Sequence, residues 1–361
     1  MKYVDEYRDP RAVRELADAI NRMDVSRSCL MEVCGTHTMS IARYGLRELV
    51  AARAALISGP GCPVCVTAQE DIDWFLEAAR LPGIIAATFG DMMRVPGSHS
   101  NLEQERARGA DVRVVYSPAD AVELARRNPD RQVVFFGVGF ETTAPAVAMS
   151  VLEAKADSLA NYTVFSAHKL IPPALKALVA APELAVNGFI LPGHVSVILG
   201  SKPYEFVARE HRVPCVIAGF EPVDVLQAVR MLLAQIADER AEVEIAYGRA
   251  VMPDGNPRAR AVVGEVFDVA DARWRGLGEV AGSGLSFNVA HRDFDARARF
   301  DVSPPPAVEP AGCRCGEVLR GVLAPEQCAL FGERCTPRDP VGPCMVSSEG
   351  SCAARHRYAR A

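Results

Sequence analysis

The sequence predicts an α/β protein with parallel sheets, followed by a separate cysteine-rich segment. Between residues 29 and 240, short apolar segments alternate with amphipathic ones, as in parallel strands joined by helical crossovers. Residues 133–138 are apolar throughout, which is typical of a central parallel strand covered on both faces. The 361 residues suffice for two or three domains of ordinary size, and we expect two α/β units of similar layout.

The first half of the chain is expected to alternate between short strands and longer helices. The strands are apolar runs, at residues 29–33, 55–58, 84–89, 112–116 and 133–138. The helices between them have amphipathic spacing, at residues 39–55, 67–80 and 118–127. Ser117 followed by Pro118 is typical of an N-cap with proline in the first turn, so the third helix should begin there.

The second half repeats this scheme and then changes. Helices are expected at residues 143–159, 173–180, 195–211 and 222–239, and strands at residues 162–166, 188–191 and 214–218. After about residue 242, strands are expected at residues 243–251 and 262–269, and glycine becomes frequent. Residues 301–312, with three consecutive prolines, predict a stiff linker to an irregular, turn-rich C-terminal segment.

Composition and charge limit the functions that we expect. The net charge is −5, and no apolar run is long enough to span a membrane. The N-terminus is charged and lacks the apolar core of a signal peptide, so we expect a cytoplasmic protein without a membrane segment. Basic residues gather at residues 355–360, but no basic stripe with interleaved aromatic residues argues for nucleic-acid binding.

Eleven cysteines in such a chain indicate metal or redox chemistry, because a reducing cytosol discourages structural disulfides. Six of them gather near the C-terminus: Cys313, Cys315, Cys328, Cys335, Cys344 and Cys352. Four thiolates suffice for a [4Fe–4S] cluster, whereas a structural zinc site normally uses short Cys-x-x-Cys pairs. The spacing therefore favours iron–sulfur over zinc, and it leaves open which four of the six are ligands.

Cys62 and Cys65 form a Cys-x-x-Cys motif directly after a predicted strand. This spacing suits a redox dithiol whose first thiol has a pKa lowered by a helix N-terminus. It also suits two ligands of one metal ion. Two inert buried thiols are the alternative, since cysteine is often buried.

Cys34 and His37 also follow the end of a predicted strand and precede a helix. Open α/β sheets bind ligands at the carboxyl ends of their strands. A thiolate and an imidazole three residues apart can share an iron, or His37 can act as a base toward Cys34. We expect both residues to lie at the same sheet edge as Cys62 and Cys65.

Other polar residues at predicted strand ends receive a structural interpretation. Residues 137–143 lack the final glycine of a dinucleotide fingerprint and no Walker A sequence occurs, so we expect a tight turn with Glu141 facing the crevice. His168 and His194 are each expected to be satisfied polar residues rather than ligands. Cys29 and Cys215 fall within apolar strands and are expected in the core.

Several long motifs closely resemble those of the HypD family, which takes part in [NiFe]-hydrogenase maturation. The matching segments are Cys34-Gly35-Thr36-His37-Thr38, residues 59–65, 139–145, 166–169, 192–196 and 219–222, and the block from Cys313 to Cys352. The resemblance extends from about residue 29 to residue 352, and no cysteine position departs from the family pattern.

The resemblance implies two similar α/β domains and a third, cysteine-rich domain that wraps a [4Fe–4S] cluster. The expected bounds are residues 25–131 for the first domain, residues 132–240 for the second, and residues 1–24 with 241–361 for the third. Cys34, Cys62 and Cys65 fall in the first domain. The family's cluster pattern leaves Cys315 and Cys344 as non-ligands and carries onto four cysteines, Cys313, Cys328, Cys335 and Cys352.

The resemblance also implies a scaffold on which the Fe(CN)₂CO group of the hydrogenase is assembled. Cys34 would hold the iron jointly with a thiolate of the small chaperone HypC, and HypE would bind transiently to deliver cyanide. Cys62 and Cys65 would form a thiol/disulfide pair, or further metal ligands, near that site. Soft thiolates suit low-spin Fe(II), and a cluster and a dithiol can supply electrons singly and in pairs. The alternatives are an iron–sulfur-dependent thiol–disulfide reductase and a zinc-stabilised binding module.

Overall fold

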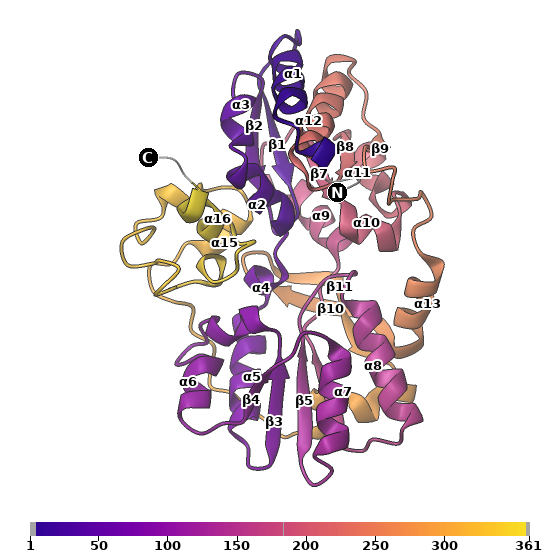
Figure 1. The fold of residues 1–361 in the computed structure, drawn as a ribbon, viewed down its shortest axis with the longest axis vertical. Helices are drawn as coiled ribbons and strands as arrows, with labels where there is room; N and C mark the ends of the chain where they lie inside the picture. Colours follow the sequence, from indigo (N-terminus) through magenta and orange to yellow (C-terminus); the bar gives the residue numbers. More distant parts are fainter. Residues whose placement is uncertain (1–4, 183, 359–361) are drawn as a thin grey trace.

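Two parallel sheets form the two lobes of the molecule (Figure 1). The computed structural model describes residues 5–182 and 184–358. The sheet of the upper lobe has the strand order β2-β1-β7-β8-β9, and all of its neighbouring strands are parallel. Its strands are β1 (Ser28–Glu32), β2 (Ala54–Ser58), β7 (Gly188–Pro192), β8 (Cys215–Ala218) and β9 (Val243–Ile245).

Helices cover both faces of the upper sheet. Among them, α12 begins with Pro222 in its first turn, and the backbone N–H of Glu221 donates to Asp224 in a capping box. The helices of this lobe are η1 (Asp5–Tyr7), α1 (Pro10–Asn21), α2 (Gly35–Arg43), α3 (Leu46–Leu49), α9 (Ile171–Val179), α10 (Gly193–Leu199), η3 (Lys202–Tyr204), α11 (Glu205–His211) and α12 (Pro222–Ala237).

The lower lobe holds a four-stranded parallel sheet in the order β4-β3-β5-β6. Its strands are β3 (Ile84–Thr88), β4 (Val112–Val114), β5 (Gln132–Gly137) and β6 (Tyr162–Ser166). Its helices are α5 (Gln69–Arg80), η2 (Gly90–Arg94), α6 (Leu102–Ala107), α7 (Pro118–Arg127) and α8 (Ala144–Ala156). Ser117 caps α7 as expected, with its side chain accepting from the backbone of Asp120.

An antiparallel ribbon lies between the two lobes (Figure 1). It consists of β10 (Phe267–Trp274) and β11 (Gly278–Phe287), preceded by α13 (Pro257–Val266) and followed by η4 (Val289–Phe294) and α14 (Ala296–Arg299). Trp274 of the ribbon pairs with Thr67, and Gly284 pairs with Lys169. The ribbon is therefore bridged to two connecting segments, the one at Thr67 before α5 and the one at Lys169 after β6.

The cysteine-rich segment packs beside the upper lobe and the middle of the molecule, where it is drawn in yellow (Figure 1). Its helices are short: α15 (Cys315–Leu319), η5 (Pro325–Gln327), η6 (Pro343–Met345) and α16 (Ser351–Tyr358). The rest is irregular, as the sequence predicts. Contacts between α16 and α2 and between α4 (Pro63–Val66) and η6 join this segment to the motifs at Cys34 and Cys62.

The α/β class with two parallel sheets and a third, cysteine-rich region is confirmed, but the sheets divide the chain differently from the expected boundary at residues 131 and 132. β1 pairs with β7 in the upper sheet, while β3 pairs with β5 in the lower one. The lower sheet is thus an insertion between β2 and β7. Alternation of strands and helices predicts a parallel sheet, but it does not say which strands are neighbours.

Four expected elements also differ. The helix expected at residues 195–211 is divided into α10, η3 and α11, and the strand expected at residues 243–251 is limited to β9. The helix expected at residues 39–55 is two helices, α2 and α3, separated by Gly45 with a φ of 64°. Residues 262–266, expected in a strand because of their β-branched side chains, form the end of α13. That helix begins at Asn256, whose side chain accepts from the backbone of Ala259, and Pro257 follows in the first turn.

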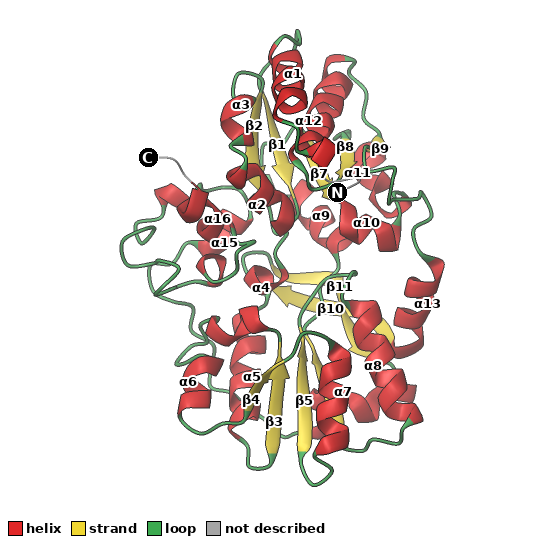
Figure 2. Ribbon diagram, viewed as in Figure 1, coloured by secondary structure: helices red, strands yellow, loops and turns green. Residues whose placement is uncertain are grey.

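The carboxyl ends of the two sheets face each other across the middle of the molecule. The arrowheads of β1, β3 and β5 point toward this region in Figure 2. The strands are anchored by buried apolar residues, with Phe75 stacked on Phe136 in the lower lobe at a centroid distance of 4.3 Å. Cys215 is buried in the core as expected, whereas Cys29 is only partly buried.

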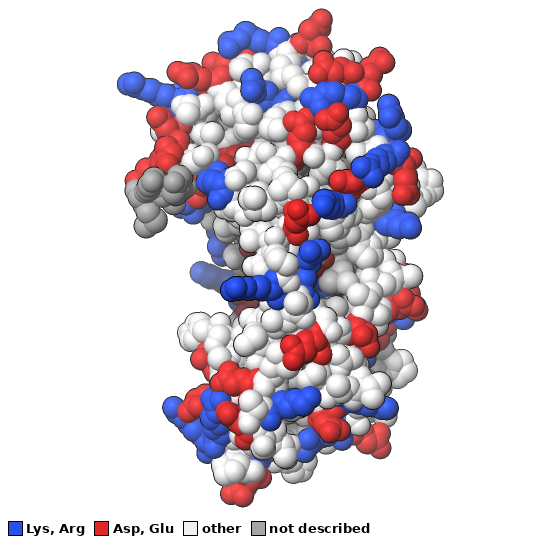
Figure 3. Space-filling model, turned by 90° about the vertical axis from the view of Figure 1, so that its right-hand side faces the viewer, with Lys and Arg blue, Asp and Glu red and all other residues white. Residues whose placement is uncertain are grey.

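The face drawn in Figure 3 carries no large patch of a single charge. Lys and Arg side chains are interspersed with Asp and Glu over both lobes on that face. Among the residues that the structure describes, no helix combines the length and the apolar character needed to cross a bilayer.

Candidate functional site

The upper sheet changes winding direction between β1 and β7. β1 is followed along the chain by β2 on one side, and β7 is followed by β8 on the other. Ligands of open α/β sheets bind at such a point, outside the carboxyl ends of the strands. Cys34 follows β1 and His194 follows β7, and Cys34 Sγ lies 3.7 Å from His194 Nδ1. Cys34 and His194 therefore lie together at the switch point of the upper sheet.

Cys34 is the N-cap residue of α2 and is 1% exposed. Burial raises the pKa of its thiol well above the usual range. The backbone N–H groups of His37 and Thr36, at the start of the helix, act in the opposite direction and favour the thiolate. The thiol is thus neutral in the free protein, and it stands where a helix N-terminus can stabilise its charge once a metal ion replaces the proton.

The two histidines near Cys34 have different partners. His37 Nε2 donates to the carbonyl oxygen of Gly219 at 2.8 Å, so it is oriented by the backbone after β8. Burial lowers the pKa of His37 and of His194 to about 4, so both rings are neutral at neutral pH. His194, expected to be a satisfied polar residue, is the imidazole in contact with the Cys34 sulfur.

Glu32, at the end of β1, fixes the Cys34 loop through hydrogen bonds. It is fully buried, its Oε2 accepts from the backbone N–H of Cys34 at 3.0 Å, and its Oε1 accepts from the hydroxyl of Thr38. Burial raises the pKa of Glu32 to about 7, although hydrogen bonds from Ser58, Thr38 and Cys34 oppose the shift. The sequence gives no warning of this role, because Glu32 stands inside an apolar strand.

Glu32→Gln is expected to become more stable relative to the wild type as the pH rises. The folded-state pKa of Glu32 is above the unfolded value, so the wild type loses stability between about pH 4.5 and pH 7, when the unfolded chain releases this proton first. Glutamine stays neutral and can still accept from the Cys34 N–H. The difference in unfolding free energy should shift in favour of the variant by on the order of 2–3 kcal/mol between pH 4.5 and pH 8, measured by urea unfolding.

The control for this measurement is Glu15→Gln, at an exposed position on α1. Its effect should stay within about 0.5 kcal/mol at both pH values. A change in unfolding free energy of the same size at both pH values for Glu32→Gln would show that the pKa of Glu32 is not raised in the folded protein.

Cys62 and Cys65 lie directly beside the Cys34 loop. Gly35 N–H donates to Gly61 O at 2.8 Å, and a Cβ atom at Gly61 would lie 2.0 Å from Cys34 N. Only glycine permits this close approach. Cys62 is the N-cap of the short helix α4, and its sulfur accepts from the backbone N–H of Cys65 at 3.3 Å. The two thiol motifs therefore meet at one sheet edge, as the sequence predicts.

The terminal cysteines surround a small cavity with mostly apolar walls. Six thiols line it: Cys313, Cys315, Cys328, Cys335, Cys344 and Cys352. Cys315 Sγ and Cys344 Sγ are 2.6 Å apart. The four ligands that the family pattern implies are among the six, and soft thiol donors are those that iron–sulfur clusters use, so the donor set is compatible with a [4Fe–4S] cluster.

A chain of thiols joins this cavity to Cys62 and Cys65. Cys65 interacts with both Cys62 and Cys344, and its sulfur lies 3.9 Å from the carbonyl oxygen of Pro343 in η6. Cys344 in turn interacts with Cys315 and Cys352. Burial raises the pKa of the Cys65 thiol well above its usual range. Sulfur atoms from distant parts of the sequence therefore form one continuous series.

Within residues 5–182 and 184–358, no three His, Cys, Asp or Glu side chains are arranged to hold one metal ion. Cys34, Cys62 and Cys65 are thus neighbours without forming a complete three-ligand site. Ligands of one tetrahedral ion, with bonds of about 2.3 Å, must lie within about 4 Å of one another, whereas a cluster of four irons spreads its ligands more widely.

Glu349 is a further residue at this site that sequence reasoning missed. It stands between η6 and α16 and accepts from the hydroxyl of Thr36 at 2.6 Å. A Cβ atom at Gly35 would lie 2.6 Å from Glu349 Cβ, so the turn packs tightly on the start of α2. No motif or periodicity in this irregular segment distinguishes Glu349 from a solvent-exposed acidic residue.

Polar residues at the carboxyl edge of the lower sheet have other partners. Glu141 Oε1 accepts from the backbone N–H of Ile171 at 2.9 Å, so it helps to fix the start of α9. Burial raises the pKa of Glu141 to about 7. His168 Nδ1 lies 3.0 Å from Ser166 Oγ, which partly meets the expectation of a satisfied polar residue.

Comparison with known proteins gives a consistent family result. The family model described as "HypD: Hydrogenase formation hypA family" matches residues 11–359. The hydrogenase maturation factor HypD of Rhodobacter capsulatus is 47% identical, over 99% of this chain and 98% of its own length. The HypD factor of Azotobacter vinelandii is 47% identical, over 100% and 97%. The HypD factor of Escherichia coli K12 is 44% identical, over 99% and 98%.

Proposed function

Because the chain belongs to the HypD family of hydrogenase maturation factors, we propose that it is the scaffold on which the Fe(CN)₂CO group of a [NiFe]-hydrogenase is assembled. Membership of the family supports a role in hydrogenase maturation. Two observations carry the finer proposal. The Cys62/Cys65 pair and the terminal cysteines form one series of interacting thiols, and the backbone of the Cys34 loop is hydrogen-bonded to Gly61, directly beside Cys62.

In this proposal Cys34 is the protein's ligand to the incoming iron. Binding of Fe(II) releases the thiol proton, and the N–H groups at the start of α2 stabilise the resulting thiolate. His194 Nδ1 lies 3.7 Å from the sulfur, but its pKa is lowered to about 4, so the released proton passes on to the solvent rather than staying on this ring. A second thiolate comes from the partner HypC, which accounts for the incomplete ligand set around Cys34.

The thiol series gives the site a path for electrons. When bound by Cys313, Cys328, Cys335 and Cys352, a [4Fe–4S] cluster would supply or accept one electron at a time. Cys62 and Cys65 release two electrons and two protons when they form a disulfide, and they take up the same number when it is reduced. Cys344 stands between the two groups, in contact with Cys65 and Cys352. Eleven free cysteines suit a reducing compartment, so we place this activity in the cytoplasm.

The partners must reach a buried sulfur. Cys34 is 1% exposed, and the turn at Glu349 packs on the start of α2. We propose that docking of HypC, and the later transient docking of HypE to deliver cyanide, moves this turn away from Thr36 and exposes the sulfur. The bond between Thr36 and Glu349 is a side-chain contact, and breaking it costs only about 1–3 kcal/mol.

Vibrational spectroscopy tests the proposal directly. The protein, purified together with HypC from cells that express the other maturation factors, should show stretching bands of metal-bound CN and CO. A complex that retains HypC and iron but lacks these bands would contradict the scaffold function.

The thiol series also favours a second candidate, an iron–sulfur-dependent thiol–disulfide reductase. Turnover of a substrate disulfide without any hydrogenase partner, in a preparation that never carries the CN and CO bands, would support this candidate. A colourless protein with one zinc ion after anaerobic purification would exclude both.

A further inference from the structure

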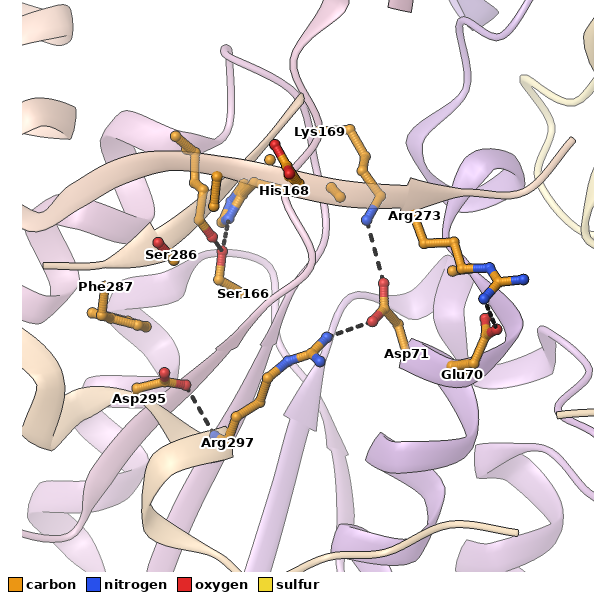
Figure 4. Close-up of a pocket in the computed structure, with 16 residues that line it drawn as sticks. Glu70, Asp71, Ser166, His168, Lys169, Arg273, Ser286, Phe287, Asp295 and Arg297 are labelled. Carbon is orange, nitrogen blue, oxygen red and sulfur yellow. Dashed lines mark hydrogen bonds and ion pairs between the residues drawn. The ribbon is translucent and has the colours of Figure 1, made fainter. Parts of the chain in front are cut away.

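A second cavity lies at the carboxyl edge of the lower sheet (Figure 4). It is bounded by the start of α5, the residues that follow β6, the ribbon β10–β11 and the region of α14. Its volume is about 370 Å³, within the range of about 300–1,000 Å³ that is usual for small-molecule sites. None of the cysteines lines it, so the proposed iron chemistry does not use it.

Two cations share one buried carboxylate in this cavity. Lys169 Nζ lies 3.3 Å from Asp71 Oδ2, and the guanidinium group of Arg297 donates to Asp71 Oδ1. The Lys169 side chain is 3% exposed. Figure 4 shows Lys169 and Arg297 approaching Asp71 from opposite sides. A buried ammonium group is costly unless opposite charge is close, and here one carboxylate serves two cations.

Arg297 is held in place before any ligand arrives. Its guanidinium carbon lies 4.2 Å from the centre of the Phe165 ring, a cation–π contact. Its backbone N–H donates to Asp295 at 2.9 Å at the start of α14. The charged end of the side chain is therefore fixed at the wall of the cavity by Phe165 and Asp71.

The remaining acidic groups of the wall already have donors. Glu70 is paired with Arg273 at 3.2 Å, on the exposed side of the cavity, and Asp295 caps α14. Asp271 accepts from the backbone N–H of Gly282 at 2.8 Å.

An ammonium group has three N–H bonds and a guanidinium group has five. Asp71 engages only part of this capacity, so Lys169 and Arg297 keep N–H donors to spare, and together with Asp71 they carry one net positive charge. Over the whole wall four carboxylates face three cations, so an anion would have to be held locally by these two side chains.

We propose that this cavity binds a small oxyanion, a carboxylate or a phosphate group, through Lys169 and Arg297. Both side chains present N–H donors from fixed positions, and charge-assisted hydrogen bonds to oxyanions are the strong ones. At about 30 Å³ for each water-sized group, the volume admits a ligand of roughly a dozen non-hydrogen atoms. The ribbon that forms one wall also holds the segment after Cys65, through the bridge from Trp274 to Thr67.

The test uses the full chain and two probes, inorganic phosphate and succinate. Thermal unfolding is followed at rising probe concentration and constant ionic strength, with chloride as the reference anion. A ligand that binds the folded state raises the midpoint in a saturable way. A saturable rise with phosphate alone assigns the site to a phosphate group, and a rise with succinate alone assigns it to a carboxylate.

Two variants test the residues. Lys169→Met and Arg297→Gln should each weaken binding of the effective probe by about tenfold or more, since each removes a charged hydrogen bond. Arg297 is half exposed, so its variant remains informative if Lys169→Met fails to fold. The matched control is Lys202→Met, which breaks an exposed ion pair with Asp254 and should leave probe binding unchanged.

Two results would overturn the proposal. One is the absence of a saturable shift with either probe beyond that of chloride. The other is undiminished binding in the folded Arg297→Gln variant.

Discussion

Cys34→Ala is expected to abolish hydrogenase maturation and to leave the iron–sulfur spectrum unchanged. Substitution of residues that merely support a metal ligand lowers metal affinity or activity by about 10–100-fold. Loss of the ligand itself should lower them by at least about 100-fold. The cavity of the terminal cysteines does not include Cys34, so the cluster should be retained. Hydrogenase activity in cells that carry the variant, and the optical spectrum of the purified protein, are the two measurements.

Cys29→Ala is the matched control for this variant. Cys29 stands in the same strand, β1, and is partly buried, but it does not reach the carboxyl edge. It should support maturation at close to the wild-type level. Normal hydrogenase activity with Cys34→Ala would remove Cys34 from the iron site, and a bleached spectrum would mean that the substitution acts through the cluster.

Cys328→Ser is expected to lose its cluster during purification. Serine replaces a soft thiolate by a harder and more weakly coordinating hydroxyl group, and retention of the cluster should fall by about tenfold or more. Iron content and the absorption of the protein purified without oxygen measure this loss. Maturation should fall with it if the cluster supplies electrons to the Cys62/Cys65 dithiol, as we propose.

The comparison variant is Cys344→Ser, which lines the same cavity. The family pattern makes Cys344 a non-ligand, so this variant should keep its iron and its absorption while interrupting the thiol series between Cys65 and the cluster. An unchanged iron count in Cys328→Ser, or a lost cluster in Cys344→Ser, would show that the ligand set is different.

Local features of the fold can be predicted well from the sequence. The apolar run at residues 133–138 is a central strand, β5, and the Ser117–Pro118 pair starts α7. Which strands are neighbours could not be predicted, because the pairing of β1 with β7 depends on contacts between residues far apart in the sequence. No periodicity in either strand encodes that partnership.

The candidate site likewise contains residues that the sequence predicts and residues that only the folded structure reveals. Cys34, Cys62 and Cys65 could be placed at one sheet edge because each follows a strand, and parallel strands end on the same side. Glu32 and Glu349 could not be found, since one is hidden in an apolar strand and the other in an irregular segment. The role of Glu32 comes from its burial and from the loop that folds back onto it, and the role of Glu349 comes from a contact with Thr36, far away in the sequence; both exist only after folding.

The insertion of the lower sheet between β2 and β7 has a consequence during synthesis on the ribosome. The lower sheet is complete once β6 has emerged, but β1 must wait for β7, which ends at Pro192. At about 5–20 residues per second, the Cys34 loop remains without its neighbouring strand for roughly ten to thirty seconds. The nascent chain therefore carries exposed thiols during this interval, before β7 shields them, and these thiols are then accessible to oxidants and metal ions.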